Sequence, residues 1–211
     1  RAQLVEAMRS TDGLTQGGAA GASAPGDWRM GRIVAEAEYQ ASMTRIERDM
    51  GLLMQSSETA FRDTLREAAV YGIDTEGHEA ASDYLRERAE RRRQQGDRVG
   101  AVTDEYLALS VEADLAAELA EETGQPEHVA AAEEAEQRKQ QGRLLVEQAI
   151  TAQARREAAE RGLVGAEADA FVDRTVATSL DSVDREAERI TGEIKADRPA
   201  QEVIHAIEAG A

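Results

Sequence analysis

Cysteine is absent from this chain of 211 residues, and proline and aromatic side chains are scarce, with three Pro, one Trp, four Tyr and two Phe. The lack of Cys excludes disulfide frameworks, thiol catalysis and thiolate metal ligands. Positive charge is also in short supply, because 25 Lys and Arg stand against 42 Asp and Glu, for a formal net charge of −17. Phosphate backbones are held by clustered Lys and Arg, so this balance argues against a general nucleic-acid-binding surface.

Long apolar runs are missing as well. No run approaches the roughly 20 residues that a membrane helix needs, so we expect no membrane span in this segment. The chain starts at Arg1 rather than Met, and Leu4 and Met8 share one helical face. We therefore expect residues 1–10 to be the end of a helix that begins upstream, and residues 11–27, which are rich in Gly, to be a hinge.

What is present is the pattern of long helices. No Pro interrupts residues 28–71, and Gly72 is a natural C-terminal stop. Within this segment, apolar residues from Tyr39 to Leu53 recur at alternating spacings of four and three, which is typical of a coiled-coil seam. A stripe at Phe61, Leu65 and Ala68 then continues in a shifted register. A helix this long with so narrow a seam predicts a partner helix.

Residues 72–211 predict a helical hairpin or bundle region. Caps and stops at Asp97, Gly124, Pro126 and Gly162 divide it into helices. The expected helices run from Asp74 or Thr75 to Gln95, from Asp97 to Gly124, from Pro126 to Arg161, from Ala166 to Ala196 and, after Asp197 and Pro199, over 201–208.

The sequence therefore predicts an all-α fold of long helices and helical hairpins, extended rather than globular. Many seam positions are Ala, which buries little apolar area, so we expect neighbouring subunits to complete the packing. The predicted oligomer seam comprises Tyr39, Met43, Ile46, Met50, Leu53, Val99, Val102, Tyr106, Leu109, Val176, Leu180, Val183 and Ile190.

Chemistry-bearing motifs are few. The spacing of Glu202 and His205 matches one ligand pair of a ferritin-like metal bundle, but such a site needs a second pair and further Glu residues. The Gly-rich segment lacks the ending of a phosphate loop, and no Ser lies in a hydrolase elbow. The many acid pairs read as solvated helix faces. We expect no enzyme activity, no cofactor and no metal site.

One basic cluster interrupts the acidic composition, and it comprises Arg86, Arg88, Arg91, Arg92 and Arg93. In one interpretation it contacts an acidic neighbouring subunit or nucleic acid. In the other it complements the negative end of a helix that stops at Gly96.

A short internal similarity also stands out. Residues 92–96 (RRQQG) recur as residues 138–142 (RKQQG), and residues 95–109 resemble the turn and second helix of a tetratricopeptide repeat. Arg88 and Arg92 depart from that pattern, because apolar residues are expected there. A repeat array is an alternative to a bundle.

The arrangement of residues 1–70 resembles a known family. A helical segment, a Gly- and Ser-rich break (GGAAGASAPGD) and a long helix opening with MGRIVAEAEYQASMTRIERDM follow one another. This order is similar to that of the small internal virion proteins of short-tailed bacteriophages, the inner core proteins that are ejected with the genome.

The resemblance implies a non-enzymatic virion protein that lies inside the capsid as a multi-copy helical ring near the portal, is delivered to the host envelope and helps genome delivery. Its partners would be copies of itself and other core or portal proteins, with passive contact with DNA. Two alternatives stay open, an acidic coiled-coil scaffolding protein and a tetratricopeptide-like partner-binding adaptor.

Overall fold

A computed structural model describes the backbone of residues 27–73 and 75–208 and the side chains of residues 30–73 and 75–196. The predicted upstream helix at 1–10 and nearly all of the predicted hinge lie outside the described residues, as do the side chains of Glu202 and His205. Over the described part the fold is all-α. Its five helices are α2 (Asp27–Val70), α3 (Glu76–Gln94), α4 (Arg98–Thr123), α5 (Pro126–Glu160) and α6 (Ala166–Glu208).

The predicted capping and stop residues mark the ends of four of these helices. Asp97 accepts a hydrogen bond from the backbone N–H of Gly100 at 2.9 Å and so satisfies a free donor at the start of α4. Gly124 ends α4 in the left-handed conformation, with a φ of 60°. Pro126 then occupies the first turn of α5, where its missing N–H costs nothing.

The last helix corrects one expectation. α6 is continuous from Ala166 to Glu208, so the predicted break at Asp197 and Pro199 is wrong. A proline inside a helix removes one backbone hydrogen bond and costs about 3 kcal/mol. Strong helix formers on both sides of Pro199, including Ala196, Ala200 and Gln201, favour the helix over a break.

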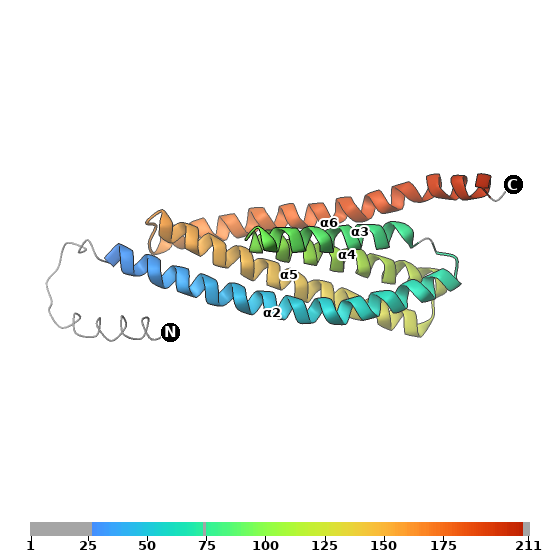
Figure 1. Ribbon diagram of the computed structural model, residues 1–211, viewed down its shortest axis with the longest axis horizontal. Helices are drawn as coiled ribbons and strands as arrows, with labels where there is room; N and C mark the ends of the chain where they lie inside the picture. Colours follow the sequence, from blue (N-terminus) through green and yellow to red (C-terminus); the bar gives the residue numbers. More distant parts are fainter. Residues whose placement is uncertain (1–26, 74, 209–211) are drawn as a thin grey trace.

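The five helices form an elongated bundle in which α2, α5 and α6 run along most of its length (Figure 1). α4 lies at its centre, because it packs against α2, α3, α5 and α6. From Ala101 to Ala116 every residue of α4 except Thr103 and Asp114 is buried. A single helix of this chain is therefore enclosed by its own neighbours.

This arrangement places the predicted oligomer seam inside one chain. The seam side chains Tyr39, Met43, Ile46, Met50, Val102, Tyr106, Leu109 and Leu180 are buried in the main core, and Leu53, Val99, Val176, Val183 and Ile190 pack against it. The partner helices that the long α2 needs are α4 and α5. Its seam is filled without a second subunit, and association with further copies stays a prediction.

The shifted stripe near the end of α2 forms a smaller core. Phe61 and Ala68 are buried with Leu115 and Leu119 of α4, and Leu65 packs against them. The change of register predicted after Ala60 therefore serves to follow α4 toward its C-terminal end.

The internal similarity does not reflect a structural repeat. Gly96 follows α3 with a positive φ of 80°, whereas Gly142 lies in the middle of α5. A Cβ at Gly142 would lie 2.8 Å from a methyl group of Leu109, so this glycine permits the close approach of α4 and α5. Because the two copies occupy different structures, the internal similarity does not support the alternative of a repeat array.

Within the described ranges, no helix has the length and apolar character that crossing a membrane requires.

Candidate functional site

The most unusual chemistry of the bundle lies between α3 and α4. The two helices form an antiparallel hairpin, which brings the basic cluster of α3 opposite three carboxylates of α4. Asp104, Glu105 and Glu112 are all buried, with exposed fractions of 0%, 7% and 5%. Ionised side chains are rarely buried without partners. The arginines of α3 supply these partners.

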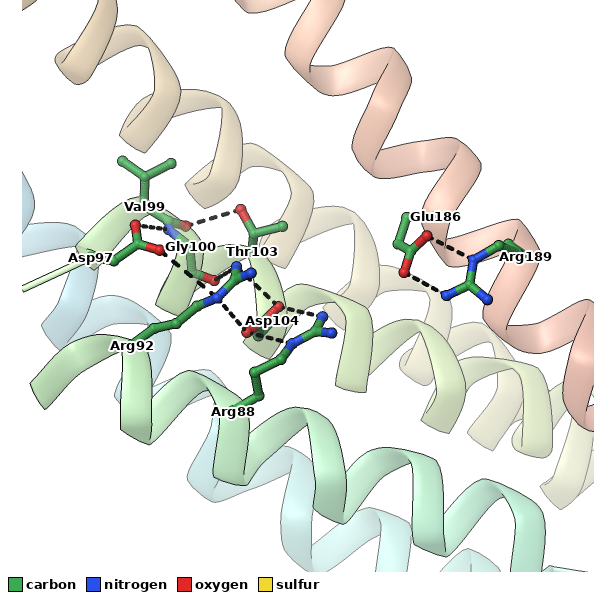
Figure 2. A network of polar contacts seen from close by, with 9 residues as sticks. All are labelled: Arg88, Arg92, Asp97, Val99, Gly100, Thr103, Asp104, Glu186 and Arg189. Atoms are coloured by element: carbon green, nitrogen blue, oxygen red, sulfur yellow. Dashed lines mark hydrogen bonds and ion pairs between the residues drawn. The ribbon is translucent and has the colours of Figure 1, made fainter. Parts of the chain in front are cut away.

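Asp104 is at the centre of this network (Figure 2). The guanidinium of Arg88 donates to its two carboxylate oxygens at 2.9 and 2.7 Å, which is a bidentate pair. Arg92 lies 3.4 Å from the same carboxylate and also donates to the carbonyl oxygen of Gly100 at 3.3 Å. The hydrogen bond to Asp104 is the main reason that the pKa of Arg88 is raised.

Glu105 and Glu112 each have one arginine partner from α3. Arg93 donates to Glu105, and Arg86 donates to Glu112. Burial raises the pKa of Glu105 despite the nearby Arg93. These pairs join the two helices along the length of the hairpin.

The carboxylate of Glu112 is also approached by hydroxyl groups from two other helices. Ser57 of α2 donates to one of its oxygens, and Ser82 of α3 lies 3.4 Å from the other. Burial raises the pKa of Glu112 to about 7, although the charges of Arg86 and Arg138 act to lower it. The protonated form is therefore favoured in the folded protein far more than in an unfolded chain, where a Glu pKa is about 4.3.

This shift makes a prediction about pH. Because the folded pKa lies above the unfolded one, Glu112 contributes stability that is fully present below about pH 4 and is lost as pH rises from there through about 7. We expect Glu112→Gln to raise the free energy of unfolding at pH 8 by about 2 kcal/mol and to change it little at pH 4. Urea unfolding at the two pH values measures this.

The matched control is Glu121→Gln, an exposed glutamate of the same helix, which should shift stability by less than about 0.5 kcal/mol at either pH. A Glu112→Gln protein that is less stable than the parent at pH 8 would contradict the assignment, because it would mean that the ionised pair with Arg86 dominates.

A second cluster joins three helices near the end of α4. One ligand-type atom each from His78 of α3 and from Asp114 and Glu118 of α4 lie within 4.8 Å of one another. His78 Nε2 is 3.3 Å from Asp114 Oδ2. Lys195 of α6 already approaches this group, with its Nζ 2.7 Å from Asp114 Oδ1 and 3.8 Å from Glu118.

Lys195 therefore supplies the positive charge that faces the carboxylates of this cluster. Burial acts to raise the pKa of Asp114, but hydrogen bonds from His78 and Lys195 outweigh it and leave the pKa lowered. The arrangement fits an ionised carboxylate that ties α3, α4 and α6 together. A divalent metal would have to displace Lys195, so the residues fit a polar network better than a metal centre.

The structure separates the predicted basic cluster into two groups. Arg86, Arg88, Arg92 and Arg93 point toward carboxylates of α4, while Arg91 pairs with Glu87 at the surface, at 3.5 Å. Four of the five predicted contact residues thus serve the chain itself. The predicted role at the helix end holds in part, because Arg91, Arg92 and Arg93 lie in the last turn of α3.

Sequence reasoning missed the other half of each pair. Asp104, Glu105 and Glu112 read as members of solvated acidic faces, yet they lie on the most buried helix of the bundle. The available signal was their position within the apolar stripe of residues 99–120, where a carboxylate needs a cation close by.

Comparisons of this chain with protein-family models, with curated proteins and with solved structures give no match. Its function is therefore inferred from its residues and from the geometry of the bundle.

Proposed function

We propose that this chain is a structural component of a bacteriophage particle, an internal core or ejection protein that assembles in several copies near the portal. The resemblance of residues 1–70 to that family motivates the proposal. Its described part, α2, is a single helix of 44 residues that runs along an elongated bundle (Figure 1). A rod of this kind packs side by side with copies of itself around an axis.

The observation that best supports the proposal is that most of the basic cluster points toward carboxylates inside the chain. Four arginines of α3 are engaged by buried or nearly buried carboxylates, so they do not form a basic surface. The chain as a whole carries a formal charge of −17. An acidic surface repels phosphates, which suits a protein that lies beside densely packed DNA and must let it pass.

The same geometry weakens the adaptor alternative. In a tetratricopeptide array the helices of each hairpin line an open groove. Here α4, the second helix of the α3–α4 hairpin, is enclosed by α2, α3, α5 and α6. We therefore do not propose a peptide-binding adaptor.

Mass spectrometry of purified particles tests the proposal, with immature heads and particles emptied of DNA measured in parallel. A core or ejection protein is expected in mature particles at several copies and depleted from emptied ones. Detection only in immature heads would instead identify a scaffolding protein. Absence from all three preparations would overturn the assignment to a phage particle.

A further inference from the structure

Four of the five helices form a bundle that is complete without α3. α2 packs against α4 and α5, and α6 packs against the same two helices. The core residues that these four helices share include Met43, Leu109, Val146 and Leu180. Four helices around one apolar core are a common self-sufficient fold. α3 is therefore a fifth helix added to a bundle that does not need it.

The position of α3 agrees with this view. Among the described helices it is the shortest, with 19 residues, and it lies against α4 and touches α6. Its backbone comes close to neither α2 nor α5. It reaches α2 through the side chain of Arg86, whose guanidinium lies 5.8 Å from the ring centre of Phe61. α3 thus covers one face of α4 and leaves the other helix contacts of the bundle unchanged.

α3 also contributes little apolar surface to the core. The structure describes all of its side chains, and the buried ones are His78, Ser82, Leu85 and Ala89. Leu85 is the large apolar side chain of this set. By comparison, α5 buries Leu145, Val146 and Ile150 in the same core. Because apolar burial is the main favourable term in packing, α3 is held less firmly than α5.

Ion pairs provide most of the other contacts between α3 and α4. They join Arg88 and Arg92 to Asp104, Arg86 to Glu112 and Arg93 to Glu105. The attraction within such a pair is largely offset by the cost of removing both charges from water. Opening of α3 would return water to both partners at once. The pairs therefore fix where α3 docks more than they strengthen its docking.

Both ends of α3 are connected to helices that also hold each other. α2 ends at Val70 and α4 starts at Arg98, and Arg98 pairs with Glu47 of α2 at 3.1 Å. We propose that α3 is a releasable cover, which opens as one unit while α2, α4, α5 and α6 stay folded. Opening exposes the arginines of α3 and the carboxylates of α4, so the basic cluster is hidden or presented according to the state of this one helix.

Native-state hydrogen exchange of the full chain, measured by mass spectrometry, detects this opening. Residues 82–92 of α3 should exchange together, at least about tenfold faster than residues 101–116 of α4, because a local opening requires less free energy than global unfolding. Equal rates in the two segments would mean that α3 opens only with the whole chain, and would overturn the proposal.

A variant that holds the cover open gives the second readout. Leu85→Glu/Ala89→Glu places two carboxylates at the buried docking positions of α3, where a charge without a partner is strongly disfavoured. Residues 82–92 should then exchange nearly as fast as an unfolded chain. Residues 43–50 of α2 and 145–150 of α5 should keep at least about 100-fold protection.

The matched control is Val146→Glu/Ile150→Glu, which makes the same change at the same spacing on α5, at two buried positions. It should remove protection from every helix. Loss of protection throughout the Leu85→Glu/Ala89→Glu variant, or continued protection of its α3, would overturn the proposal, as would an α5 variant that stays folded. The inference does not rest on the proposed function, because particle composition can fail while this exchange pattern holds.

Discussion

Met43→Ala is expected to lower the free energy of unfolding by about 3 kcal/mol, which is the scale of a large-to-small change in a packed core. Met43 is 0% exposed and lies in the seam of α2, in the core that this helix forms with α4 and α5. Truncation removes apolar contacts and leaves a cavity among helices of the same chain. Urea unfolding followed by circular dichroism measures the change.

The matched control is Val70→Ala on the same helix, since Val70 is 82% exposed. It should shift stability by less than about 0.5 kcal/mol. If Met43→Ala were equally mild in monomeric protein, the seam of α2 would not be packed within one chain, and the central feature of the bundle would be wrong.

Asp104→Asn is expected to cost about 2 to 3 kcal/mol. Asp104 is 0% exposed and forms ion pairs with both Arg88 and Arg92. Removing one partner of a buried pair leaves the other charge uncompensated, which costs about 3 to 5 kcal/mol when both are fully buried. The side chains of Arg88 and Arg92 are 25% and 36% exposed, so water recovers part of that loss.

The ion pair of Arg143 and Asp184 has a similar geometry but is more exposed to solvent, so it serves as a comparison. Its closest contact is 2.7 Å, as for Arg88 and Asp104, but the two side chains are 40% and 36% exposed. We expect Asp184→Asn to cost less than about 1 kcal/mol. Equal effects of Asp104→Asn and Asp184→Asn would mean that burial does not set the strength of the α3–α4 network.

Local sequence signals predicted the helices well. Asp97, Gly124 and Pro126 act through the backbone within one turn, so their effect can be read without knowledge of the fold. The exception is Pro199, where the flanking helix formers outweigh a signal that usually marks a boundary.

The partners of each face could not be predicted in the same way. The spacing of Tyr39, Met43 and Ile46 indicates that α2 needs a helix beside it, but the same spacing suits a helix of another copy or of the same chain. That choice depends on how the later helices fold back. The same is true of Arg88, whose partner Asp104 lies on the next helix and becomes a neighbour only when the hairpin closes.

The enclosure of α4 by four helices of one chain is the claim on which the rest depends. Hydrogen exchange measured by mass spectrometry on the parent chain, kept dilute so that it is monomeric, tests it most directly. We expect the amides of Ala101–Ala116 to exchange last, at the rate of global unfolding. Exchange of α4 as fast as that of the exposed residues Ala69 and Val70 of α2 and Ala166 and Glu167 of α6 would contradict it, because α4 would then lack its neighbours in the single chain.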